Sequence, residues 1–176
     1  MQKIILFFIL SLSFINITLA EEYIYILSDA KLNDLYFSAK KYFRNSQIRV
    51  FKDIRGVLIT LEIDDILNEY ALISDKTLRN LEKIEYFLAK MKNPVIIEVH
   101  TAKFPLNNSL NLKNWEISTV IANKIETILL KNGRISRGQI KSVGYGEFLP
   151  SKNTPYNGVK NSGRVDIILL CSISGE

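Results

Sequence analysis

The polar residues best placed to bind a ligand follow an apolar run and precede an apolar-striped segment. The run Val95 to Val99 ends at the polar step His100-Thr101, and Asn114 opens the striped segment. The first backbone N–H groups of a helix have no partner within it, and they attract anions. We therefore expect the strand end, the loop and the helix start to form a cradle for a small charged ligand.

The other reactive side chains do not form a catalytic set. His100 is the only histidine and Cys171 the only cysteine, and neither lies in a motif that completes a nucleophilic triad. His100 is interpreted as a strand-end residue paired with a neighbour. The acids Asp64 and Asp65 near Glu62 lack partners at metal-ligand spacing, which indicates a turn. We expect no enzymatic activity, no cofactor and no bound metal.

Two amphipathic helices are predicted to position the cradle. Ser74-Asp75 is a typical helix start, and Asn93-Pro94 ends that helix because the residue before proline avoids the helical region. Its apolar residues recur at helical spacing: Leu78, Leu81, Ile84, Leu88 and Met91. The second helix begins at Asn114 and ends at Asn132-Gly133. Its apolar stripe comprises Ile117, Ile121, Ile125 and Ile128.

Strand patterns surround these helices and define the fold class. An alternating segment before residue 52, a turn at 53–56 and a return through 57–61 predict a hairpin. Further strands are predicted at 95–99, 140–143 and 164–171, with a turn at 144–147. The order strand-strand-helix-strand-helix-strand-strand implies an α+β fold, in which helices pack on one face of a mixed β-sheet.

The N-terminal residues have the layout of a secretory signal peptide. Lys3 precedes an apolar run, and small residues at 18–20 offer a cleavage site after Ala20. The alternative is a retained inner-membrane anchor. Residues 21–46 are rich in aromatic side chains and predict a helical extension that packs on the domain or on a partner. Its basic cluster, Lys40-Lys41 with Arg44, is interpreted either as a solvated helix face or as a contact with anionic lipid or glycan.

Several segments, in the right order, resemble the OmpA-like (OmpA/MotB C-terminal) peptidoglycan-binding domains, most of all the flagellar MotB-like members. The segments are Gly56–Leu61 for the opening strand, Ile97–Ala102 for E-G-H-T-D, Asn114–Ser118 for N-W-E-L-S, Val143–Glu147 with Pro150 for V-G-Y-G-E-x-x-P, and Asn153–Pro155 with Asn161–Ile167 for N-T-P and N-R-R-V-E-I. The resemblance implies an OmpA-like domain over residues 47–172, after the signal peptide 1–20 and the extension 21–46, and before a tail 173–176.

The resemblance also implies where a ligand would bind. Members of the family hold the diaminopimelate of the cell-wall stem peptide, with an Asp for its ammonium and an Arg for its carboxylate. Ala102 and Ile121 stand at these two positions, so both charged contacts are absent. Each such contact is worth about 1.5–3 kcal/mol, and losing both costs roughly two to four powers of ten in affinity.

The expected function is non-catalytic association with peptidoglycan in the periplasm or cell envelope, through a degenerate site. The implied ligand-binding residues are His100, Thr101, Asn114 and Arg164, with Lys103 as a substitute cation for a carboxylate. The wall need not be of the diaminopimelate type. The alternative is a structural scaffold of the envelope that has lost wall binding and holds a protein partner. Nothing in the sequence resembles a nucleic-acid-binding module.

Overall fold

The computed structural model describes residues 29–46, 48–62, 73–101, 113–148 and 163–171. The predicted signal peptide, the start of the extension, the tail, Ala102 and Lys103 lie outside these residues. After an N-terminal helix at 29–42, the elements are β1 (Arg49–Asp53), β2 (Gly56–Glu62), α2 (Asp75–Met91), β3 (Val95–His100), α3 (Asn114–Leu130), the short 3₁₀ helix η2 (Arg137–Gln139), β4 (Ile140–Gly146) and β5 (Arg164–Leu170). The predicted element order is confirmed.

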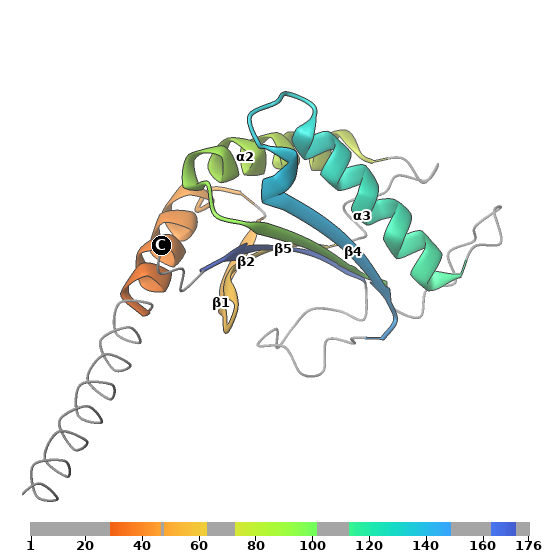
Figure 1. Cartoon of the computed structure of the whole chain (residues 1–176), viewed down its shortest axis with the longest axis horizontal. Coiled ribbons are helices and arrows are strands. Elements are labelled where there is room, and N and C mark those ends of the chain that lie inside the picture. The colour runs from red at the N-terminus through yellow and green to blue at the C-terminus, as the bar shows by residue number, and fades with distance from the viewer. Residues whose placement is uncertain (1–28, 47, 63–72, 102–112, 149–162, 172–176) are drawn as a thin grey trace, which may run out of the picture.

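The five strands form one mixed sheet in the order β1-β2-β5-β3-β4. All neighbouring pairs are antiparallel except β3 and β4, which are parallel. A parallel pair needs a crossover connection, and α3 supplies it. In Figure 1, α2 and α3 lie over one face of the sheet, which confirms the α+β class with helices on one face. We call the opposite face the helix-free face, because neither α2 nor α3 covers it (Figure 1).

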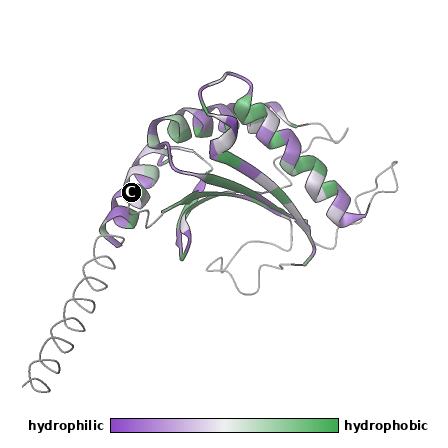
Figure 2. Cartoon of the chain, viewed as in Figure 1, coloured by the Kyte–Doolittle hydropathy of each residue, from purple (hydrophilic) through white to green (hydrophobic). Residues whose placement is uncertain are grey.

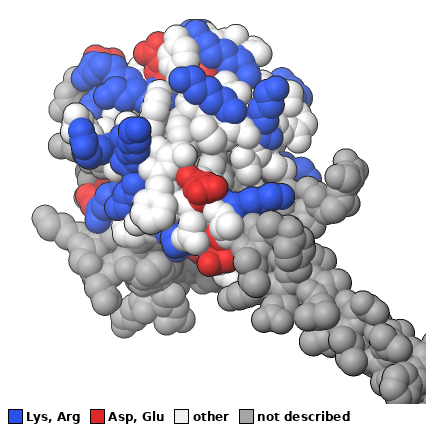
Figure 3. Space-filling view, turned by 90° about the vertical axis from the view of Figure 1, so that its left-hand side faces the viewer, with Lys and Arg blue, Asp and Glu red and all other residues white. Residues whose placement is uncertain are grey.

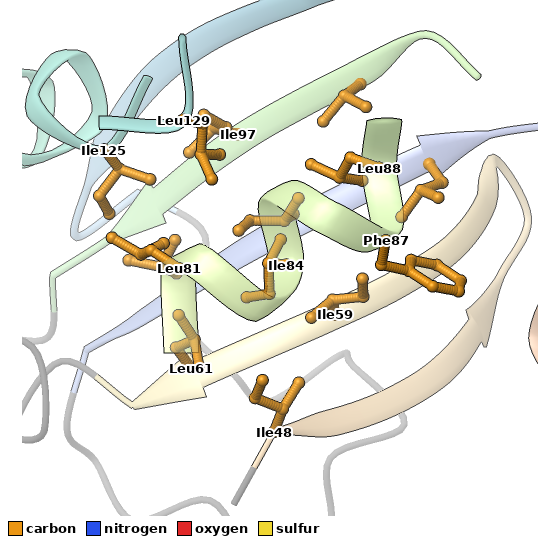
Figure 4. Close-up of a cluster of buried hydrophobic side chains, with 14 of the residues drawn as sticks. Ile48, Ile59, Leu61, Leu81, Ile84, Phe87, Leu88, Ile97, Ile125 and Leu129 are labelled. Carbon is orange, nitrogen blue, oxygen red and sulfur yellow. The ribbon is translucent and has the colours of Figure 1, made fainter. Parts of the chain in front are cut away.

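The hydrophobic core fills the space between the sheet and the helices. Alternate residues of the central strands point into it, including Ile59, Ile97 and Ile167, all fully buried. Figure 2 shows hydrophobic and polar residues alternating along α2 and α3. Figure 4 shows Leu81, Ile84, Phe87 and Leu88 of α2 beside the strands, and Ile125 and Leu129 of α3 belong to the same hydrophobic cluster.

The ends of α2 form as its sequence predicts. The Ser74 hydroxyl accepts a hydrogen bond from the Thr77 N–H at 3.2 Å. The helix ends at Lys92, which has a left-handed conformation with φ 57°, two residues before Pro94. The predicted apolar stripe is wrong at Leu78, which is 40% exposed, because the buried face is centred on Leu81, Ile84 and Leu88.

The N-terminal helix adds to the same core. Leu35, Ala39 and Phe43, at helical spacing, are buried against the domain. The Phe43 ring packs edge-on against Phe87 of α2, with centroids 5.2 Å apart. This part of the extension therefore packs on the domain. In the described ranges, no helix is both long enough and apolar enough to cross a bilayer.

The turn predicted at 144–147 begins later than expected, because β4 continues through Gly146. A β-carbon at Gly144 would lie 2.3 Å from the Thr119 backbone nitrogen, so glycine allows β4 to pass directly under α3. Gly146 has φ 57°, and the β3–β4 register shifts at His100. The glycines taken as turn residues thus permit close packing and an irregular strand end.

Candidate functional site

The carboxyl end of β3 and the start of α3 lie side by side and form what we call the mouth. The Thr101 N–H donates to the Gly146 carbonyl at 2.9 Å, which ties β3 to β4. The Thr101 hydroxyl lies 3.4 Å from the Asn114 carbonyl oxygen, to which it donates. Thr101 is buried and Asn114 half-buried. The sequence prediction that strand end and helix start meet is therefore correct.

The start of α3 is capped by its own side chains. The Lys113 N–H donates to the Glu116 carboxylate at 2.6 Å. The Ser118 hydroxyl accepts from the Gly146 N–H and donates to the Trp115 carbonyl, both at 2.9 Å. Because Glu116 neutralises part of the positive end of the helix, the mouth attracts anions less than a bare helix start would.

A largely buried polar cluster, which we call the buried cluster, occupies the helix-free face behind the mouth; Arg55 is its exposed member and Tyr145 is half-buried. Its members come from four strands and the β1–β2 turn: Arg55, Thr60, Glu98, His100, Tyr145, Arg164 and Asp166. In the sheet register, Asp166 lies beside Thr60 and Glu98, and Arg164 beside His100. Buried charges are stable only when paired, so this cluster depends on its internal contacts.

Glu98 and Arg55 form the main ion pair of the cluster. Arg55 Nη1 donates to Glu98 Oε1 at 2.7 Å and Nη2 to Oε2 at 3.2 Å, a two-point contact. Burial alone would raise the pKa of the Glu98 carboxyl, but the adjacent His100 and Arg55 outweigh it and lower the pKa to about 2. Glu98 raises the pKa of the Arg55 guanidinium in turn. Glu98 is therefore ionised throughout the physiological range.

His100 lies between two carboxylates. Its Nε2 is 3.8 Å from Glu98 Oε2 and 3.7 Å from Asp166 Oδ2, beyond hydrogen-bond range, and its ring stacks on Tyr145 with centroids 5.1 Å apart. Neither ring nitrogen has a hydrogen-bond partner among the described residues. Burial, with a smaller contribution from Glu98, raises the pKa of the Tyr145 hydroxyl.

Asp166 joins the remaining members of the cluster. It accepts from Arg164 Nε at 2.7 Å and from the Thr60 hydroxyl at 2.8 Å. Arg164 and Asp166 are each at most 5% exposed. The Thr60–Asp166 hydrogen bond links β2 to β5 on the helix-free face, and the Arg164–Asp166 pair holds Arg164 inside the fold.

The structure therefore divides the residues that the sequence singled out. Thr101 and Asn114 meet at the mouth, whereas His100 and Arg164 lie in the buried cluster. Lys103 lies outside the described residues.

Two further positions near the mouth differ in exposure. Ile121, at the position of the family Arg, is 4% exposed and belongs to the hydrophobic core. Trp115 is 51% exposed at the start of α3.

Arg55, Tyr145 and Asp166 were not among the residues that the sequence pattern predicted to be functional. A pattern in the strands pointed to part of the cluster. Glu98 and His100, and likewise Arg164 and Asp166, are spaced by two in otherwise apolar strands, so each pair lies on one face. Nothing in the sequence places Arg55 beside Glu98, because a tertiary contact between a turn and a strand joins them.

Comparison with solved structures identifies the fold. The cell wall anchor of the T6SS from Pseudomonas aeruginosa is 19% identical, with a TM-score of 0.64, over 76% of this chain and 96% of that one. The periplasmic domain of Helicobacter pylori MotB is 17% identical, with a TM-score of 0.59, over 71% and 82%. The chain has the OmpA/MotB-like fold. An outer membrane protein from Borrelia burgdorferi B31 is 26% identical, with a TM-score of 0.51, over 72% and 99%.

The sequence comparisons give no match: no protein-family model and no curated protein matches the chain. The expected OmpA/MotB-like fold is thus confirmed by structure alone. The proteins that share it include a cell-wall anchor, a periplasmic domain and an outer membrane protein, all of the bacterial envelope.

Proposed function

We propose that this chain is a non-catalytic envelope protein that associates with peptidoglycan at the mouth. The observation that carries the proposal is the contact between the Thr101 hydroxyl and the Asn114 backbone carbonyl, within a fold shared with a cell-wall anchor along almost all of that anchor's length. Asn114 and the half-exposed Trp115 offer a polar and an aromatic surface there. In this proposal His100 and Arg164 support the mouth from behind.

The site is degenerate, because both family charges are replaced. Ala102 removes the carboxylate expected for the ligand's ammonium, and Ile121 is a core residue in place of the cation. A ligand held here relies on Asn114 and backbone groups, with Lys103 as the nearest substitute cation. A wall whose diamine lacks the second amino-acid head fits such a site better than a diaminopimelate wall.

A sacculus pull-down tests the proposal. Wild type is expected to pellet with sacculi, and Asn114→Ala is expected to lose most of that binding. Asn45→Ala removes the same group from an exposed turn and serves as the matched control. Failure of wild type to pellet, with a protein recovered in its place, would favour the envelope scaffold, the alternative function.

A gain-of-function variant tests the missing charge. Ala102→Asp restores one charge-assisted contact, so its affinity for diaminopimelate-type sacculi is expected to rise about tenfold or more. Ala102→Asn is the uncharged control. If wild type already binds these sacculi as tightly as Ala102→Asp, the site is not degenerate and this part of the proposal is wrong.

A further inference from the structure

The exposed side of the N-terminal helix carries one hydrophobic and three basic residues at helical spacing. Phe37, Lys40, Lys41 and Arg44 follow the i, i+3, i+4, i+7 pattern and are all exposed; we call them the basic stripe. Phe37 is 62% exposed. Within the described part of the chain, none of the three cations has an acidic partner. Figure 3 looks onto this end of the molecule and shows Lys and Arg side chains over much of it.

A hollow beside the basic stripe combines a charged rim with an apolar floor. It has a volume of about 340 Å³ and lies between the end of the helix and β1. Its cations are Lys40, Arg44 and Arg49, and its apolar residues are Phe43, Ile48, Val50 and Phe51. Arg49 also pairs with Glu62, which leaves the other two cations to attract an anion.

Aromatic rings and cations alternate around this surface. Lys40 lies 5.8 Å above the Tyr36 ring, and Lys52 of β1 lies 5.3 Å from Tyr36 and 6.0 Å from Phe37. Tyr42 is also 43% exposed. Exposed aromatic rings beside cations are typical of surfaces that sit at a bilayer interface, where cations contact phosphates and rings enter the acyl boundary.

We propose that the basic stripe and its hollow dock on a bilayer surface rich in anionic phospholipid. The cations at the rim of the hollow would contact a lipid phosphate, and its apolar floor would contact the start of the acyl chain. A soluble anion would leave Phe37 in water, whereas a bilayer covers it. Docking would use an end of the molecule that is separate from the mouth, because the stripe and the hollow share no residue with it.

Vesicle cosedimentation with the full chain tests the proposal. Vesicles of phosphatidylethanolamine with about 30% phosphatidylglycerol are compared with neutral phosphatidylcholine vesicles, which give the baseline for any binding by residues 1–20. Wild type is expected to prefer the anionic vesicles and to lose that preference between about 50 and 500 mM NaCl. Equal binding to both vesicle types would overturn the proposal.

Charge-removal variants locate the surface. Each cation near an anionic bilayer contributes about fivefold in partitioning, so removing three is expected to lower the anionic preference about a hundredfold. The test variant is K40Q/K41Q/R44Q, and the matched control is K124Q/K131Q/K141Q, which removes three exposed lysines from α3, its C-cap and β4. If both variants lose the same amount, net charge rather than the stripe is responsible and the proposal is wrong.

Two further variants test whether membrane docking uses the exposed Phe37 ring and whether it is independent of wall binding at the mouth. Phe37→Ser keeps all charges and is expected to weaken binding to anionic vesicles severalfold, with an unchanged circular dichroism spectrum because Phe37 is exposed. Asn114→Ala is expected to leave vesicle binding unchanged. If K40Q/K41Q/R44Q reduces sacculus binding but not vesicle binding, the stripe contacts the wall and not a bilayer, and the proposal fails.

Discussion

The ion pair between Glu98 and Arg55 predicts how the stability of the fold depends on pH. The pKa of Glu98 falls from 4.5 to about 2 on folding. At about 1.4 kcal/mol per pKa unit, the ionised carboxyl contributes about 3 kcal/mol to the free energy of unfolding. Since the folded state favours the ionised form, this contribution is complete above pH 4.5 and disappears as the pH falls through about 2.

Urea denaturation at a series of pH values measures this contribution. As the pH falls from neutral towards about 2, the free energy of unfolding of wild type is expected to fall by about 3 kcal/mol through Glu98, in addition to the decrease caused by other acids. In Glu98→Gln this loss is absent, and its free energy of unfolding at pH 7 is lower by about 3 kcal/mol because Arg55 loses its anionic partner. Trp115 fluorescence and circular dichroism both report the unfolding.

Glu62→Gln is the matched control. Glu62 pairs with Arg49 at the edge of the same sheet, but both side chains are about one third exposed. Such pairs contribute at most about 1 kcal/mol, so this variant should follow the wild-type pH dependence closely. The reasoning is refuted if Glu98→Gln shows the same slope as wild type between pH 5 and pH 3.

Three other changes have expected outcomes. Gly144→Ala places a methyl group against the backbone of α3 and should cost about 1–3 kcal/mol in urea denaturation, whereas Gly138→Ala, with open space around it, should change little. Phe43→Ala should cost about 3–5 kcal/mol and speed hydrogen exchange in the N-terminal helix; an equal effect from the exposed Phe37→Ala would contradict the packing described. The pKa of the Tyr145 hydroxyl should lie above its ordinary value of 10. An alkaline absorbance titration measures it as the difference between wild type and Tyr145→Phe. A pKa at or below 10 would contradict the burial of this hydroxyl near a carboxylate.

The sequence predicted the elements well because their signals are local. Ser74, the apolar stripe of α2 and Pro94 fix that helix within a short stretch of chain. The end of β4 was placed too early because glycine was taken as a turn residue. The close approach of α3, which requires Gly144, appears only in the tertiary structure.

The candidate site was less predictable than the fold. The mouth follows from sequence order, since Thr101 ends a strand and Asn114 begins the next helix. The buried cluster does not, because its contacts join residues far apart in the chain, such as Arg55 with Glu98 and Thr60 with Asp166. Long-range pairs of this kind depend on the sheet register, which no local pattern specifies.

The central position of β5 has a consequence for how the protein folds. This strand comes last among the described elements, yet it pairs with both β2 and β3, and Thr60 must find a partner 106 residues further along the chain. A chain synthesised from its N-terminus therefore cannot close the sheet until residues 164–170 are available. Until then the edges of β2 and β3 that face β5 are unpaired, so we expect slow folding that is limited by the entropy of this long closure.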